Sequence, residues 1–264
     1  MAASKELTDD LRLAHLMADD ADSLSMNRFK AQDLQFSSKP DNTPVTEADT
    51  AVEESLRRTL SRTRPRDAIK GEEFADSGES RRRWIIDPID GTKNYLRGVP
   101  VWATLIGLEV QGQIVASVVS APALGRRWWA SLGGGAYTGR SLLNATELSV
   151  SRVTSLADAS LSYSDIAEWV ASGKGQGFVD LMRGCWRSRA YGDFWSYMMV
   201  AEGCVDIACE PDLQLYDMAA LDIIVREAGG RFTDLDGTDG PWGKGAVATN
   251  GLLHDTVLEY LGKY

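Results

Sequence analysis

Histidine is scarce in this chain of 264 residues, with only His15 and His254 present. A surface or half-buried structural role is expected for both, so a catalytic triad built on histidine has almost no members. The sequence also lacks the Gly-x-Ser-x-Gly, His-Glu-x-x-His, Gly-x-x-x-x-Gly-Lys-Ser/Thr and Gly-x-Gly-x-x-Gly patterns. If the chain is an enzyme, its chemistry therefore has to come from carboxylates, hydroxyls and bound metal ions.

Cysteine is equally sparse, and Cys185, Cys204 and Cys209 contain no Cys-x-x-Cys pair. An odd number without that spacing indicates neither a disulfide framework nor a zinc ribbon, and it fits a reducing compartment. The first 22 residues are acidic and amphipathic, unlike a secretory leader. The longest uncharged stretch, residues 110–125, is too short and too polar to span a bilayer. These features predict a soluble, cytoplasmic protein without a membrane partner.

Positive charge is in deficit, because 28 Lys and Arg stand against 38 Asp and Glu, a net charge of −10. Nucleic acid is therefore not an expected partner, since no basic excess neutralises its phosphates. Apolar residues make up 44 % and charged residues 25 %, which is typical of a globular protein that buries its own core. An acidic protein can still process a phosphate ester if it first collects cations.

The first half of the chain predicts helices followed by strands. Apolar residues at helical spacing predict a helix over residues 6–30, and Thr46 caps a second helix over residues 46–62. Residues 1–148 are therefore expected to form an α+β half. Strand patterns follow at residues 68–74, 84–92, 101–110 and 113–120, with a Gln-Gly turn between the last two, and residues 123–139 continue the antiparallel meander.

The second half alternates between strand and helix patterns, which is typical of an α/β arrangement over residues 149–264. Both halves are expected to pack together as one unit. The predicted strands are residues 159–164, 186–192, 205–210 and 246–250, and the predicted helices are residues 178–183, 194–203, 216–230 and 252–264.

The densest chemical signal is the string DPIDGT at residues 87–92. A strand is expected to deliver Asp87, Pro88 to end the ladder, Gly91 to permit a tight turn and Thr92 to cap the helix that follows. Two carboxylates, a free carbonyl and unpaired N–H groups would then surround one point. Carboxylate and carbonyl oxygens suit Mg²⁺, and N–H groups at a helix start suit phosphate. An isolated pair of acids would indicate only a capped turn, but here the whole string serves one geometry.

Other acidic residues have ordinary explanations when each is taken alone. Glu72 and Glu73 resemble solvated loop acids, and Asp49 has the spacing of a capping box. Asp217 opens the helix over residues 216–230 as an N-cap, which stabilises by about 1 kcal/mol. Together they form a stronger case, since each stands at a strand end or a helix start in a chain with little histidine.

These strings resemble the inositol monophosphatase family, whose members are Mg²⁺-dependent, lithium-sensitive phosphomonoesterases. The likeness rests on Gly71-Glu72-Glu73, on DPIDGT and on Asp217 followed by Glu227-Ala228-Gly229-Gly230. It extends from the segment Lys39–Asp49 to Gly230. It implies a layered αβαβα sandwich, a homodimer and two or three Mg²⁺ per active site.

The resemblance also implies a role for individual residues. Gly91 and Thr92 would hold the phosphate, and Glu73 or the Thr92–Asp49 pair would orient the attacking water. Tyr216 departs from the tryptophan that many members carry before the ligand Asp217, which leaves the ligand intact. The implied metal ligands are Glu72, Asp87, the Ile89 carbonyl, Asp90 and Asp217, and all of these except Asp87 are also expected to contact the substrate.

The implied chemistry answers an electrostatic problem. An anionic ester repels an anionic nucleophile, and carboxylates alone would increase that repulsion. Two or three Mg²⁺ reverse the local sign, so the expected step is direct in-line attack by a metal-activated water without a phosphoenzyme.

Substrate choice has to come from side chains outside the metal cluster. Arg189, Asp193 and Glu210 are the predicted contacts, and Asp193 has the alternative of capping the helix over residues 194–203. Additional anions beside the leaving group suit a substrate that carries positive charge there. The chain is most similar to the histidinol-phosphatase branch found in actinobacteria, through residues 100–103, 121–124, 126–129 and 189–194.

This branch implies hydrolysis of L-histidinol phosphate, a small-molecule ester of histidine biosynthesis. Inositol-1-phosphate is the alternative substrate, and a divalent-cation-binding regulatory protein is the alternative without catalysis. A nucleotidase or sugar bisphosphatase is a third possibility, for which no adenine-stacking motif is evident. Four tryptophans in or beside strand patterns are instead expected in the core or at an interface, namely Trp84, Trp102, Trp128 and Trp129.

Overall fold

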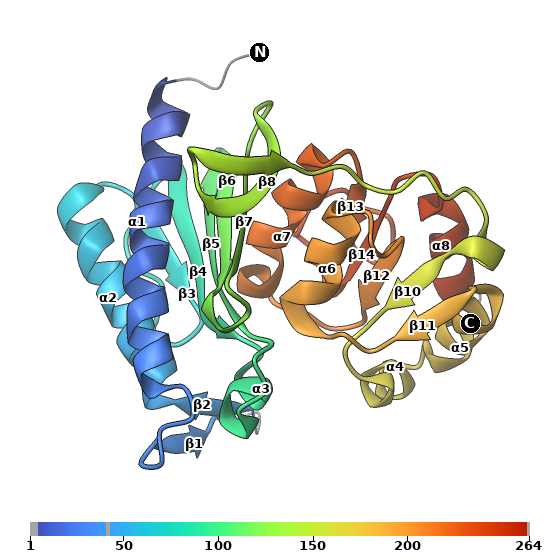
Figure 1. Ribbon diagram of the computed structural model, residues 1–264, viewed down its shortest axis with the longest axis horizontal. Helices are drawn as coiled ribbons and strands as arrows, with labels where there is room; N and C mark the ends of the chain where they lie inside the picture. Colours follow the sequence, from blue (N-terminus) through green and yellow to red (C-terminus); the bar gives the residue numbers. More distant parts are fainter. Residues whose placement is uncertain (1–4, 41–42, 263–264) are drawn as a thin grey trace.

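The computed structural model describes residues 5–40 and 43–262. Residues 41 and 42 of the segment Lys39–Asp49, and the end of the helix predicted to reach residue 264, lie outside the described residues. Within the described part, helices and sheets alternate in five layers (Figure 1). The layered αβαβα sandwich expected from the sequence is confirmed.

The first helical layer consists of α1 (Lys5–Arg28) and α2 (Glu47–Thr63), as predicted from the apolar spacing. It covers one face of a seven-stranded sheet with strand order β3-β4-β5-β6-β7-β8-β9. Only β3 and β4 pair in parallel, and the predicted hairpin turns at Gln111-Gly112 with positive φ at both residues. The strands are β3 (Ala68–Gly71), β4 (Arg82–Asp90), β5 (Ala103–Val110), β6 (Gln113–Ala121), β7 (Arg126–Ser131), β8 (Gly135–Ser141) and β9 (Asn144–Glu147).

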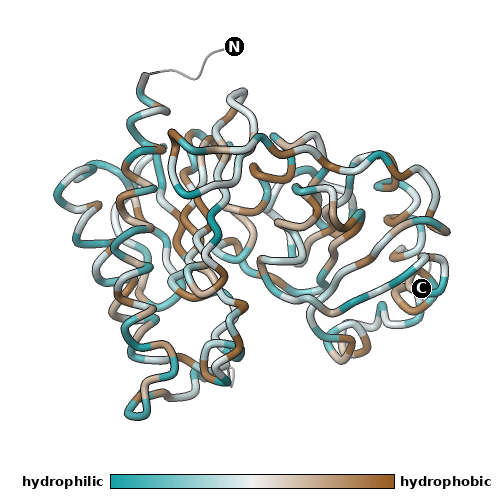
Figure 2. The backbone as a smooth tube through the Cα atoms, in the orientation of Figure 1, coloured by the Kyte–Doolittle hydropathy of each residue, from teal (hydrophilic) through white to brown (hydrophobic). Residues whose placement is uncertain are grey.

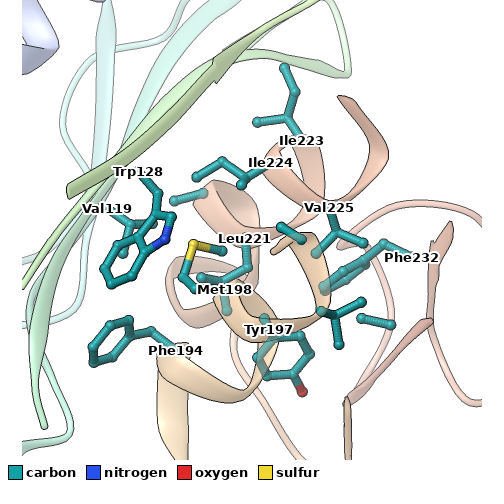
Figure 3. Packing of buried hydrophobic residues seen from close by; sticks show 14 of the residues in the cluster. Val119, Trp128, Phe194, Tyr197, Met198, Leu221, Ile223, Ile224, Val225 and Phe232 are labelled. Carbon is teal, nitrogen blue, oxygen red and sulfur yellow. The ribbon is translucent and has the colours of Figure 1, made fainter. Parts of the chain in front are cut away.

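A central helical layer separates this sheet from the second one. It consists of α6 (Asp193–Ala201) and α7 (Leu215–Glu227), and α7 packs on β5 and β6. Figure 3 shows Met198 of α6 and Leu221 of α7 packed together beside Trp128 of the first sheet. Figure 2 shows that hydrophobic residues occur along the strands of the first sheet and along the central helices that pack on it.

The second sheet has the order β11-β10-β12-β14-β13, and α5 (Gly175–Gly184) and α8 (His254–Leu261) form the outer layer. The predicted alternation gives parallel pairing for β11, β10 and β12, whereas β14 runs antiparallel to both of its neighbours, β12 and β13. The strands are β10 (Ser160–Ser162), β11 (Arg187–Arg189), β12 (Ile207–Glu210), β13 (Arg231–Thr233) and β14 (Ala246–Thr249).

Several short elements carry too few residues to show a period in the sequence, and none of them was predicted except the helix that follows DPIDGT. Two of them, α3 and α4, border the site described below. These elements are β1 (Phe36–Ser38), β2 (Pro44–Thr46), α3 (Thr92–Arg97), α4 (Ile166–Ala171), β9, β13 and the 3₁₀ turns Pro122–Leu124 and Leu156–Asp158.

Both histidines are more deeply buried than expected. His15 is 7 % exposed and His254 is fully buried. Burial lowers the pKa of each imidazole to about 4, so both are neutral at pH 7. His254 hydrogen-bonds to the hydroxyls of Thr233 and Thr249, which is a structural role. The four predicted core tryptophans are also buried, and no helix among the described residues is long and apolar enough to cross a membrane.

A buried carboxylate organises the loop after β3. Glu53 of α2 is fully buried and accepts hydrogen bonds from the backbone N–H of Glu73 at 2.7 Å and from Arg57 Nε at 2.7 Å. A β-carbon on Gly71 would fall within the Glu53 carboxylate. Glycine at this position therefore lets α2 fix the backbone that carries Glu72 and Glu73.

We expect Gly71→Ala to lower the free energy of unfolding by about 2 kcal/mol, because overpacking displaces a buried, fully bonded carboxylate. Urea denaturation measures the change. Gly184→Ala at the end of α5 is the matched control, since its β-carbon would meet its nearest neighbour at 3.6 Å. Equal stabilities for the two variants would contradict the role given to Gly71.

Candidate active site

The end of β4 is irregular, and the irregularity places two carboxylates together. β4 does not stop at Pro88 as predicted but continues to Asp90. Asp87 pairs with Leu105 and Asp90 with Ala103, so β4 contains one extra residue there. In a regular strand, side chains three residues apart point to opposite faces, and the bulge redirects them.

Three carboxylates from two distant segments meet at this bulge. Asp87, Asp90 and Asp217 each offer an oxygen, and these oxygens lie within 4.8 Å of one another. Asp217 is the third residue of α7 and accepts the backbone N–H of Gln214 at 2.6 Å, so it completes a capping box instead of serving as the N-cap. Asp90 accepts the backbone N–H of Phe194 at 2.7 Å.

Burial and mutual repulsion both disfavour the ionised carboxylates of this cluster. Burial, followed by the charges of Glu72, Asp90 and Asp217, raises the pKa of Asp87 well above its usual range. Burial and neighbouring acids raise the pKa of Asp90 as well, and that of Asp217 to about 7. Asp87 Oδ1 is buried without a hydrogen-bond partner among the described residues. An all-oxygen donor set with an unpartnered buried oxygen fits a hard divalent cation such as Mg²⁺.

Glu72 and Glu73 flank the cluster but bind a lysine. Lys39 Nζ lies 2.6 Å from Glu72 Oε1 and 2.8 Å from Glu73 Oε1. Glu72 also lies against Asp87, whereas the group of three converging oxygens does not include it. Burial raises the pKa of Glu73 to about 7 despite the ion pair with Lys39. Lys39 was not predicted as a site residue, because nothing local marks a lysine whose partners are more than thirty residues away.

The turn after β4 differs in two respects from the expected phosphate cradle. Gly91 adopts φ +85° and is the N-cap of α3, so Thr92 is the first helical residue and does not cap the helix. Thr92 Oγ1 lies 3.0 Å from the Ile89 carbonyl and 3.2 Å from Asp49 Oδ1. The Ile89 carbonyl therefore has the Thr92 hydroxyl as a hydrogen-bond neighbour, and it keeps a second lone pair for another ligand. The capping box of Asp49 with Thr46 is confirmed.

A cavity of about 430 Å³ opens beside the cluster and is strongly acidic. Asp193 and Glu210 line it together with Asp90 and Asp217, and α4 contributes Glu168. Glu210 is 4 % exposed, and its Oε1 has no hydrogen-bond partner among the described residues. Burial and the charge of Asp193 raise the pKa of Glu210 well above its usual range. The lining residues that sequence reasoning missed include Lys93, Asn94 and Ser164.

Asp193 does not cap α6, contrary to the alternative considered from the sequence. Gly192 is the N-cap, and no side chain satisfies that helix end. The Asp193 carboxylate instead accepts a hydrogen bond from Asn94 Nδ2 at 2.8 Å, and its backbone N–H donates to Ser164 Oγ at 2.9 Å. Its φ of +50° lies in the left-handed region, which costs about 1 kcal/mol for a residue with a β-carbon.

Arg189 lies outside this cavity. It is exposed on β11, at the edge of the second sheet, and its Nη1 donates to the Ser188 carbonyl at 2.7 Å. The structure therefore brings together Asp193, Glu210 and the carboxylate cluster, but it does not bring Arg189 to them.

This chain is similar to known proteins both in sequence and in fold. A profile of the inositol monophosphatase family matches residues 7–264. Histidinol-phosphatase from Streptomyces coelicolor is 61 % identical over 97 % of this chain and 97 % of that protein, and histidinol-phosphatase from Mycobacterium tuberculosis is 57 % identical over 96 % and 98 %. The crystal structure of extragenic suppressor protein suhB from Bartonella henselae has a TM-score of 0.87 at 30 % identity, covering 97 % of this chain and 99 % of that one.

The raised pKa values in the carboxylate cluster predict that the stability of the metal-free protein depends on pH. The folded protein holds Asp217 with a pKa of about 7 against an ordinary value of 3.8. Between these values the folded state binds more protons than the unfolded state, so the free energy of unfolding falls as pH rises through the window. We expect excess Mg²⁺ to remove this fall, because a cation binds the ionised carboxylates.

Urea denaturation at both ends of the window, with EDTA or with Mg²⁺, measures this effect. Asp217→Asn is the control, because asparagine keeps an acceptor for the Gln214 N–H and loses the charge. That variant should flatten the fall and weaken the response to Mg²⁺. A metal-free wild-type protein whose free energy of unfolding falls over the window no more steeply than that of Asp217→Asn would contradict the electrostatic account.

Proposed function

The chain belongs to the inositol monophosphatase family, and we infer that it is a histidinol-phosphatase, which hydrolyses L-histidinol phosphate to L-histidinol and inorganic phosphate. It is a phosphoric monoester hydrolase of histidine biosynthesis. The observation that carries this assignment is that three converging carboxylates lie beside a strongly acidic cavity. The carboxylates need cations to offset their charge, and the acidic cavity suits a leaving group that carries positive charge.

We propose that Asp87, Asp90 and Asp217 hold Mg²⁺, with Glu72 and the Ile89 carbonyl completing a set of two or three ions. Bound Mg²⁺ supplies positive charge that offsets the phosphate and lowers the pKa of a water. Glu72 would exchange Lys39 for the metal, since both compete for the same carboxylate. The oxygen-only composition of the set supports Mg²⁺ over zinc.

We propose that Thr92 and Asp49 orient the attacking water. Thr92 has one hydroxyl proton, and both of its nearest protein partners, Asp49 and the Ile89 carbonyl, are acceptors. Once that proton is donated, the Thr92 hydroxyl can only accept a hydrogen bond from a water. The water would then direct a proton at Thr92, and a lone pair of its oxygen would point away from Thr92. Glu73 is the other proposed residue for this role, and Gly91 and Thr92 would offer backbone N–H groups to the phosphate.

The leaving group is recognised in this proposal by charge. L-histidinol carries an amine and an imidazole, and either group can place positive charge beside Asp193 and Glu210. Because Glu210 is buried with an unpartnered oxygen, a cation or an N–H donor from the substrate would compensate it. A neutral polyol would leave this negative charge unbalanced.

We further propose a homodimer in a cytoplasmic location. Trp186 directly precedes the edge strand β11 and is 67 % exposed, which supports burial against a second copy. The predicted contact of Arg189 with substrate would then have to be made across that interface. Free thiols at Cys185, Cys204 and Cys209 support a reducing compartment.

The substrate assignment predicts a rank order of activities. Phosphate release should require Mg²⁺ and should be fastest with L-histidinol phosphate in a panel that also contains inositol-1-phosphate, fructose-1,6-bisphosphate and 3′-phosphoadenosine 5′-phosphate. Asp90→Asn should abolish turnover with the fold intact, because asparagine still accepts the Phe194 N–H but gives up the charge that attracts the metal.

Each alternative has its own signature in this panel. Fastest release from inositol-1-phosphate would make that ester the substrate instead of L-histidinol phosphate. Fastest release from a bisphosphate would indicate a nucleotidase or a sugar bisphosphatase. No release from any ester would favour a cation-binding regulatory protein. A folded Asp90→Asn variant that keeps its kcat would contradict the site itself.

The role of Asp193 predicts a loss of selectivity on removal of its charge. We expect Asp193→Asn to lower kcat/KM for L-histidinol phosphate at least about tenfold relative to glycerol 2-phosphate, because a charge-assisted contact is lost. Asparagine tolerates the positive φ and keeps an acceptor for Asn94, so the backbone should not move. Equal losses on both esters would remove Asp193 from substrate recognition.

A further inference from the structure

Asn94 connects the proposed phosphate-binding turn to the proposed leaving-group subsite. It lies on α3, two residues after Thr92, and its Nδ2 donates to Asp193 Oδ2 at 2.8 Å. The two residues are 99 positions apart in the sequence and come from different halves of the chain. One turn of α3 therefore carries the threonine placed at the phosphate and also holds the carboxylate placed at the leaving group.

The Asp193 carboxylate occupies an unfavourable position without this contact. Acidic neighbours Asp90 and Glu210 share the cavity with it, and their charges repel it. Lys93 lines the same cavity and attracts it from α3. Lys93 acts on the carboxylate through its charge, whereas the Asn94 amide donates a directional hydrogen bond that fixes one carboxylate oxygen.

Hydrogen bonds also fix the backbone around Asp193. Ser164 Oγ accepts the Asp193 N–H at 2.9 Å, and Asp90 accepts the N–H of Phe194 at 2.7 Å. Gly91 also approaches closely, because a β-carbon there would lie 3.3 Å from Asp193 Oδ2. A residue with positive φ that is fixed from several sides is typical of functional positions, where strain is retained for geometry.

We propose that Asn94 is a positioning residue for substrate selection, which fixes the Asp193 carboxylate at a set distance from the phosphate-binding turn. The enzyme then selects phosphate esters whose leaving group carries a cation at that distance from phosphorus. This inference rests on the proposed function, since it assigns Asn94 a role only through Asp193 and a cationic leaving group. Asn94 itself is not required to touch the substrate.

The proposal predicts a change in KM more than in kcat. Asn94→Ala should raise KM for L-histidinol phosphate about tenfold, the effect of one charge-assisted contact, while kcat changes far less. Activity on glycerol 2-phosphate should fall much less than activity on L-histidinol phosphate. Asn94→Ser, which keeps a donor at that position, should retain more selectivity than Asn94→Ala. Asn27→Ala on the exposed face of α1 is the matched control and should leave both substrates unaffected.

A double-mutant cycle separates positioning from simple support of the fold. If Asn94 acts through Asp193, Asn94→Ala should have little further effect on selectivity in an Asp193→Asn background, because there is no charge left to position. If Asn94 only stabilises the fold, the losses should multiply, and selectivity should follow melting temperature across the variants. The Asn94→Ser series keeps the cycle measurable if Asn94→Ala does not fold.

The two proposals fail in different ways. A wild-type enzyme without preference for L-histidinol phosphate over glycerol 2-phosphate would overturn the proposed function and with it the role of Asn94. A selective wild-type enzyme whose Asn94→Ala variant keeps that selectivity, or whose losses multiply in the cycle, would overturn the positioning role alone.

Discussion

Repulsion between carboxylates that the fold forces together is the constraint on which this molecule depends. Carboxylate oxygens of Asp87, Asp90 and Asp217 lie within 4.8 Å of one another, and burial together with neighbouring acids raises the pKa of each. Divalent cations relieve this repulsion, and they also bring positive charge to an ester that an acidic chain would otherwise repel. The unfavourable electrostatics of the cluster and its proposed catalytic capacity have the same origin.

The surrounding structure holds these charges by backbone donors and buried supports. Phe194 and Gln214 donate N–H groups to Asp90 and Asp217, and Glu53 fixes the loop of Glu72 and Glu73. These supports come from the first and the central helical layers, so the site depends on how both layers pack on the first sheet. The central helices α6 and α7 matter most, because one carries the N–H that binds Asp90 and the other carries Asp217.

Acidic character continues beyond the cluster into the cavity. In the proposed function, the part with Asp90 and Asp217 would gather cations for the phosphate, and the part with Asp193 and Glu210 would face the leaving group. An ester with a positively charged leaving group would satisfy both parts at once. The Lys39 ammonium binds Glu72 and Glu73, and the Asn94 amide binds Asp193. Neither contact was visible to local sequence reasoning, because the partners lie far apart in the chain.

The amino-acid sequence by itself determined the main helices, the long strands, the hairpin at Gln111-Gly112 and the acidic residues at element ends, because these follow from local periodicity and turn chemistry. The motif resemblance supplied the proposed ligand set. Only the tertiary structure decided the bulge between Asp87 and Asp90, the pairing of Lys39, the exclusion of Arg189 from the cavity and the contact of Asn94 with Asp193. These features depend on distances between segments far apart in the chain, and such distances are fixed by the packing of layers and not by the residues next in sequence.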